Sequence, residues 1–193
     1  MPTATLLIEE RLRLHIDMNV NQDKFRNIAV LDSSIKKNLI KYYNLEFLEI
    51  KAKLDSLFIN FKYKCNEFVS LETDNNEYYK QNLILLLFSS FNIFSFDVHY
   101  WIETYITTIK SYKDFLNISV YNESLFTKTQ IDEIIKLLNK LNFFLFKTVS
   151  KDILDCCQLL IKIAYEKQLE YTSSQTEKID NFFNLIDYLG ANI

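Results

Sequence analysis

Glycine and proline are almost missing from this chain. Its 193 residues contain one of each, Pro2 and Gly190. Phosphate-cradling loops, dinucleotide-binding turns and nucleophile elbows need glycine, because a Cβ atom would block the close approach of the backbone or the left-handed conformation. The sequence therefore excludes these sites, and it predicts a chain that consists mostly of long helices.

Metal-binding side chains are also scarce. The chain has two histidines, His15 and His99, and His99 stands four residues before Glu103. Zinc and iron sites need several clustered ligands, and no second pair with this helical spacing is present. The pair indicates an ion pair or a solvated helix face, and we expect no metal and no cofactor.

Three cysteines, Cys65, Cys156 and Cys157, make an odd number without any CxxC spacing. Neighbouring residues on a helix point about 100° apart, which places Cys156 and Cys157 poorly for a disulfide. We expect reduced, buried thiols and a reducing intracellular compartment such as the cytoplasm. No catalytic residue is predicted, and an enzyme with a cysteine–histidine site assembled in space is the least favoured class of function.

The overall composition indicates a folded chain of low net charge. Hydrophobic residues make up 49% and aromatic residues 15% of the sequence, which excludes intrinsic disorder and favours a single domain over residues 1–193. The net charge of −3 argues weakly against a dedicated nucleic-acid-binding domain, which is usually strongly basic. Abundant lysine, asparagine and isoleucine with little arginine is typical of a low-GC genome.

The most apolar stretch of the chain is Leu83–Phe96. About 20 apolar residues are needed to cross a bilayer, and serine and asparagine interrupt this shorter stretch. We therefore expect a buried core helix here and no membrane span. The first residues also lack the basic start that is typical of a secretory signal.

Strand-like alternation occupies residues 12–20, where apolar side chains stand at every even position and polar ones at every odd position. The apolar face of this predicted strand consists of Leu12, Leu14, Ile16, Met18 and Val20. Residues 28–31 could form a second strand of a hairpin, although they also fit a helical turn. The strand is expected to pair or pack within its own chain, and the alternative is that it adds to a sheet in a protein partner.

From residue 33 onward apolar residues recur at steps of three and four, which predicts a bundle of helices. Residues typical of N-caps predict where the helices begin: Asp32 to Ser34, Asp74, Asp97, Thr127 and Ser174. A break is predicted at Ser150 to Asp152, and Gly190 is predicted to end the last helix in the left-handed conformation. The predicted fold is mainly α, an irregular bundle of about six helices over residues 33–193, with a strand or hairpin within residues 1–31.

Four lysines recur at steps of four and seven and therefore share one side of a predicted helix: Lys136, Lys140, Lys147 and Lys151. Such a row could contact phosphate groups, although a solvated lysine face is the more common outcome. The leading interpretation is a non-enzymatic protein–protein interaction module, such as a complex subunit, adaptor, inhibitor or other regulator. It would act through helical surfaces and the N-terminal strand, and self-association stays open. The alternative is a nucleic-acid-associated helical subunit that uses the lysines.

Overall fold

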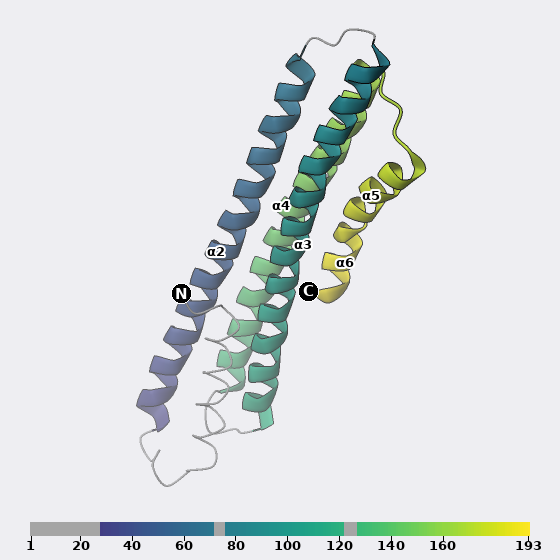
Figure 1. Ribbon diagram of the computed structural model, residues 1–193. Coiled ribbons are helices and arrows are strands. Elements are labelled where there is room, and N and C mark those ends of the chain that lie inside the picture. The colour runs from purple at the N-terminus through teal and green to yellow at the C-terminus, as the bar shows by residue number, and fades with distance from the viewer. Residues whose placement is uncertain (1–27, 72–75, 122–126) are drawn as a thin grey trace. The chain divides into compact units, whose positions relative to one another are not determined.

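The structure is a computed structural model that describes residues 28–71, 76–121 and 127–193. The mainly α prediction is confirmed, because nearly all of these residues are helical (Figure 1). The helices are α2 (Ile28–Ser70), α3 (Glu77–Tyr121), α4 (Lys128–Glu166), α5 (Ser173–Phe183) and α6 (Leu185–Asn192). Residues 28–31 begin α2, so a second strand there is wrong, and the predicted strand at residues 12–20 lies outside the described residues.

Residue contacts divide the chain into two compact units. The first unit contains α2 up to Ile50, α3 from Glu103 onward and α4 up to Phe143. The second unit contains the remaining parts of these three helices together with α5 and α6. Each of the three long helices therefore contributes to both units, and the single domain over residues 1–193 stays a prediction.

The start of α4 confirms the helix start predicted at Thr127. The backbone N–H of Thr127 donates to Gln130 Oε1 at 3.0 Å, and the backbone N–H of Gln130 donates to Thr127 Oγ1 at 3.2 Å. These two hydrogen bonds form a reciprocal capping box. The box of α5 joins Thr172 and Gln175, so the predicted start at Ser174 is two residues too late.

Two predicted interruptions of the bundle are wrong. Asp97 lies inside α3, and Ser150 to Asp152 lies inside α4. The reason is clear at Asp152, whose carboxylate accepts a hydrogen bond of 2.7 Å from Lys62 Nζ on α2. A polar residue in the middle of a helix can thus serve an ion pair with another helix. The described chain therefore has fewer and longer helices than the six predicted.

Phenylalanine side chains form much of the core of the second unit. Phe61 of α2 stacks on Phe94 of α3 with 4.1 Å between ring centroids, and Phe58 meets Phe94 edge-on at 5.6 Å. Phe182 of α5 contacts Phe91 and Phe94, with centroids 5.4 and 5.3 Å apart. Because Phe58 contacts Phe94 while Phe61 also contacts Phe91, α2 and α3 run antiparallel here. These rings also hold α5 against α3.

Gly190 serves close packing and does not end a helix. It lies inside α6, and no described glycine has a positive φ, so the predicted left-handed helix end is wrong. A Cβ atom at Gly190 would lie 3.0 Å from Cε2 of Phe146 on α4. The missing side chain therefore lets α6 approach α4 closely.

Candidate interaction surface

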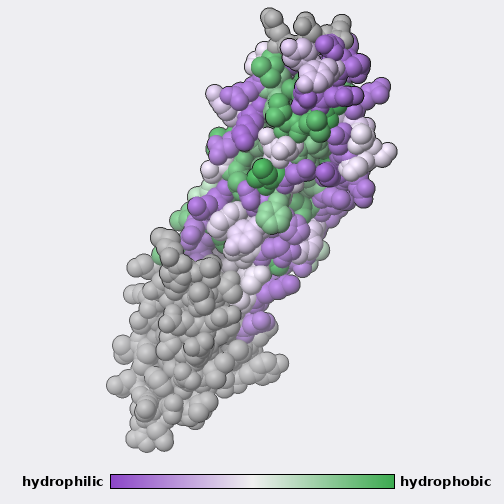
Figure 2. All heavy atoms as spheres, viewed as in Figure 1, coloured by the Kyte–Doolittle hydropathy of each residue, from purple (hydrophilic) through white to green (hydrophobic). Residues whose placement is uncertain are grey.

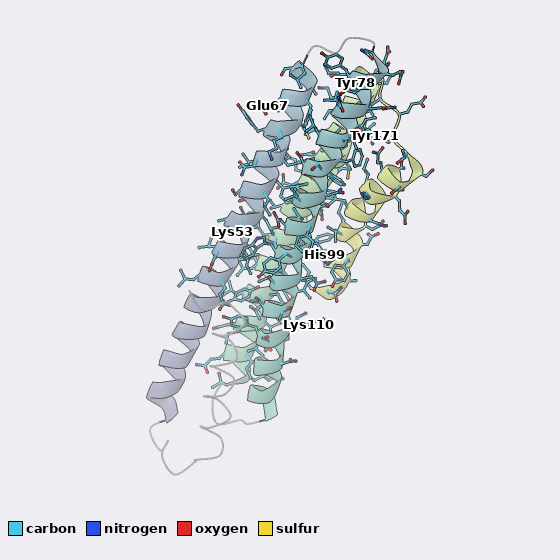
Figure 3. The ribbon with its side chains drawn as sticks, viewed as in Figure 1. Lys53, Glu67, Tyr78, His99, Lys110 and Tyr171 are labelled. Atoms are coloured by element: carbon cyan, nitrogen blue, oxygen red, sulfur yellow. The ribbon has the colours of Figure 1, made fainter. Side chains whose placement is uncertain are left out.

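One side of α3 in the second unit exposes a row of large apolar side chains. The row consists of Tyr78, Tyr79, Leu85, Leu86, Ile93, Phe96 and Tyr100, and we call it the α3 ridge. The exposed fraction of these side chains ranges from 54% to 72%. Because each residue turns a helix by about 100°, all seven fall within roughly 120° of its circumference. Tyr78 and His99 mark the two ends of this part of α3 in Figure 3.

The ridge is uncharged over most of its length. No lysine, arginine, aspartate or glutamate stands between Lys80 and Asp97. In the view of Figure 2, hydrophobic side chains gather along the middle of the described surface and hydrophilic ones lie toward its margins. Large contiguous apolar patches are unusual on monomeric proteins and mark sites of interaction.

The expectation that Leu83–Phe96 is buried is wrong for one of its faces. Leu87, Phe91 and Phe94 are in the core, whereas the ridge residues of the same stretch are exposed. Among the residues that the structure describes, α3 over Glu77–Asp114 is the one helix that is long and apolar enough to cross a membrane. That length and composition arise from two apolar faces, one packed in the bundle and one exposed.

Grooves border the ridge within the second unit. A groove of about 230 Å³ separates α3 from α2, and it is lined by Leu57, Asn60, Phe61, Lys64, Ser89, Ser90, Ile93, Phe94 and Asp97. On the other side a groove of about 510 Å³ lies between α3 and the α5–α6 pair, where Phe96 and His99 face Lys178 and Leu185. A third hollow of about 580 Å³ lies between the start of α3 and the connection from α4 to α5. An exposed row of side chains between grooves is a shape into which another helix can pack.

The four lysines singled out from the sequence are all exposed on α4. Lys136 and Lys140 belong to the first unit, and Lys147 and Lys151 belong to the second. In the second unit the side chain of Phe144, half of it exposed, stands three residues before Lys147. Lysine beside an exposed aromatic ring is a pattern that can bind single-stranded nucleic acid.

The three cysteines are free and buried, as the sequence predicts. Burial raises the pKa of Cys65 to about 12 and that of Cys157 to about 11. Burial also raises the pKa of Cys156, although the charge of Lys62 opposes the change. These thiols stay protonated at neutral pH, which disfavours a nucleophilic role.

The histidine singled out from the sequence, His99, packs beside an aromatic ring. The His99 ring lies parallel to that of Tyr188 on α6, with centroids 6.0 Å apart. No group of three or more histidine, cysteine, aspartate or glutamate side chains with metal-binding geometry occurs in the described ranges.

A buried polar cluster in the first unit escaped the sequence analysis. The hydroxyls of Tyr43 on α2 and Tyr105 on α3 lie 3.0 Å apart, and both donate to Asn142 Oδ1 on α4. Tyr112 packs edge-on against Tyr43 with ring centroids 4.8 Å apart. Sequence spacing assigns these tyrosines to the core, but it cannot show that their hydroxyls share one acceptor. The cluster favours one register of the three helices, because a shift would leave buried hydroxyls unsatisfied.

Replacing Asn142 with leucine is expected to lower the free energy of unfolding by about 2 kcal/mol. Both tyrosine hydroxyls lose Asn142 Oδ1 as their acceptor, and since one of them can donate to the other, one buried hydroxyl is left without an acceptor. Adding Tyr43→Phe and Tyr105→Phe removes both hydroxyls as well, and this triple variant is expected to regain most of the loss. Urea denaturation followed by circular dichroism measures both effects. A triple variant that is less stable than Asn142→Leu would contradict the role assigned to the cluster.

The residues of the predicted strand, Leu12 to Val20, lie outside the described ranges, so their pairing stays a prediction. The α3 ridge is the surface that sequence analysis missed. Its signal is present in the sequence as apolar residues on two faces of one helix. Comparison of the chain with known protein families, with curated proteins and with solved structures finds no match.

Proposed function

We propose that this chain is a non-enzymatic protein–protein interaction module and that the α3 ridge is its main binding surface. The observation that carries the proposal is the exposure of seven large apolar side chains on one face of a helix that has no charged residue between Lys80 and Asp97. Aromatic side chains are enriched in protein interfaces, and four of the seven ridge residues are aromatic. A role as complex subunit, adaptor or inhibitor in a reducing intracellular compartment fits such a surface.

The test compares two isoleucine-to-glutamate variants. Ile93→Glu places a charge in the α3 ridge, whereas Ile161→Glu places one on α4, and the exposed fractions of the two residues are 64% and 62%. The tagged proteins are incubated with native lysate after nuclease treatment. Wild type and Ile161→Glu are expected to retain the same protein, either a partner or an untagged copy of the chain, which Ile93→Glu loses. Equal retention by all three proteins would refute the proposal.

The N-terminal strand is a second contact within the same proposed function. The alternation over residues 12–20 supports a strand whose apolar face, Leu12 to Val20, adds to a sheet in the partner. Deletion of residues 1–22 is then expected to weaken partner binding and to leave the helical circular dichroism signal intact. Loss of the helical signal would show that the segment stabilises its own chain.

The alternative function is association with nucleic acid through the lysines of α4. The exposed Phe144 near Lys147 and Lys151 favours it. Binding of labelled single-stranded RNA or DNA should then weaken steeply with salt, because phosphate contacts release counterions. Replacing Lys147 and Lys151 with glutamine should lower the affinity and reduce the salt dependence. Retention of a nuclease-resistant protein partner together with no binding of the labelled strands would exclude this alternative.

A further inference from the structure

Four of the seven residues of the α3 ridge are placed symmetrically in sequence about Ser89. Leu85 and Ile93 each stand four residues from Ser89, and Tyr78 and Tyr100 each stand eleven residues from it. On an α-helix, displacements of four and eleven residues return a side chain to within about 40° of the starting direction. All five positions are exposed. These four residues therefore place matching bulky side chains at equal distances on either side of a small residue. The other three ridge residues, Tyr79, Leu86 and Phe96, have His99, Asn92 and Asn82 at the mirrored positions.

This symmetry makes the ridge complementary to itself. A two-fold axis through Ser89 would set a second α3 helix antiparallel to the first, because such an axis exchanges the two directions of the chain. Leu85 of each copy then lies opposite Ile93 of the other, and Tyr78 lies opposite Tyr100. Packed helix axes approach to about 8–10 Å depending on the contacting side chains, and serine facing serine permits the close end of that range.

The charge distribution and the grooves agree with such a pair. The ridge carries no charged residue between Lys80 and Asp97, so two copies meet without like-charge repulsion. Ser89 and Ile93 also line the groove of about 230 Å³ between α2 and α3. This groove begins beside the proposed axis.

The area of the ridge is also sufficient for a dimer. At roughly 100 Å² for each exposed aromatic or large aliphatic side chain, its seven residues present on the order of 700 Å² per copy. Stable interfaces bury roughly 600–1,000 Å² on each partner, and the ridge lies in the lower part of this range. A lipid bilayer would also accept an apolar face, but it has no need of a small central residue with matched residues on both sides.

We propose that the α3 ridge binds a second copy of this chain, with the two α3 helices antiparallel and crossing at Ser89. The inference rests on the proposed function and deepens it by identifying the partner. Residues near a two-fold axis meet their own copies, which makes the proposal open to a direct chemical test.

Ser89→Cys provides the first test, because the three native cysteines are buried and the new thiol is the only exposed one. Mild oxidation of the purified full chain should convert most of this variant to a disulfide-linked dimer. Ser56→Cys is the matched control, since Ser56 is an exposed serine of α2 that is not part of the ridge, and it should stay mostly monomeric. Equal cross-linking of both variants, or none of Ser89→Cys, would overturn the proposal.

Mixing Leu85→Cys with Ile93→Cys tests the antiparallel register. The mixture should form a disulfide between the two different chains faster than either variant forms one with itself. Dimers of Leu85→Cys alone that form faster than the mixed dimer would indicate parallel helices and would overturn the register. Tags of different size on the two variants distinguish the products by electrophoresis.

Sedimentation equilibrium measures the association without cross-linking. The wild type and Ile161→Glu should shift from the 23.0 kDa monomer toward twice that mass as concentration rises. Ile93→Glu places one charge in each half of the interface, and it is expected to raise the dissociation constant about 100-fold or more. Unchanged helical signal of this variant shows that the monomer still folds.

Three further outcomes identify another occupant of the ridge and overturn the proposal. A monomeric Ser89→Cys variant whose thiol is protected from alkylation, and exposed after deletion of residues 1–22, would assign the ridge to the chain's own N-terminal segment. Protection of this thiol from alkylation only when phosphatidylcholine vesicles are added would assign the ridge to a bilayer. A monomeric chain that loses a different protein partner with Ile93→Glu refutes self-association alone, whereas loss of no partner refutes the proposed function as well.

Discussion

Replacing Phe94 with alanine is expected to lower the free energy of unfolding by about 4 kcal/mol. Phe94 is almost fully buried, and its ring contacts Phe58, Phe61, Phe91 and Phe182 from three helices. The substitution removes a stacked pair and leaves a cavity among these rings, so both the transfer free energy and the packing contacts are lost. Urea denaturation followed by circular dichroism measures the change.

Phe143→Ala is the matched control, because this phenylalanine of α4 is 68% exposed. Its replacement is expected to change the free energy of unfolding by less than about 0.5 kcal/mol. Phe94→Ala should also loosen α5, which contacts Phe94 through Phe182, and limited trypsin digestion after Lys167 would report this loosening. Equal stability losses in the two variants would contradict the central position assigned to Phe94.

The second large effect is expected at alkaline pH, where the free energy of unfolding should fall by about 5 kcal/mol between pH 9 and pH 11. Burial raises the pKa of Cys65 to about 12 and of Cys157 to about 11, from an ordinary thiol value of 9.0. Burial likewise raises the pKa of Cys156, Tyr43 and Tyr105. The unfolded chain releases the thiol protons around pH 9 and the tyrosine protons around pH 10, while the folded chain keeps them. Stability is therefore full below pH 9 and is lost as the pH rises toward the folded pKa values.

Urea denaturation at pH 7.5, 9, 10 and 11 measures this alkaline loss. The control is Cys65→Ala, which lowers stability by a fixed amount at pH 7.5 because it removes buried atoms. It should also flatten the alkaline slope by up to about 1.4 kcal/mol per pH unit, the contribution of one retained proton. A stability that is the same at pH 7.5 and pH 11 would contradict the burial of these groups.

The capping box at the start of a helix was predictable from the sequence only where a single pair of residues fits the capping-box pattern. The box from Thr127 to Gln130 was predicted correctly, because its two reciprocal hydrogen bonds join residues three apart in the chain. Near α5, the pair Thr172 with Gln175 and the pair Ser174 with Glu177 both fit the pattern, and the structure uses the first. Asp152 was interpreted as a helix break because its ion-pair partner, Lys62, is 90 residues away in sequence.

The sequence predicted that the residues of the candidate surface are apolar, but it did not predict that they are exposed. The sequence shows that α3 is apolar on nearly every side, and we expected the core to cover all of it. The structure covers the face of Phe91 and Phe94 with α2 and α5 and leaves Leu85, Ile93 and Phe96 exposed. Periodicity shows which residues share a face, but it carries no information about which neighbouring helix lies there.

The sequence by itself determined that the described chain is helical, because near-absence of glycine and proline and apolar steps of three and four leave few other structures open. It also determined that the thiols lie inside, since they stand in apolar rows. The tertiary structure alone decided the length of α3 and α4, the approach of α6 through Gly190 and the exposure of the α3 ridge. These features depend on contacts between residues far apart in the chain, which local propensity cannot specify.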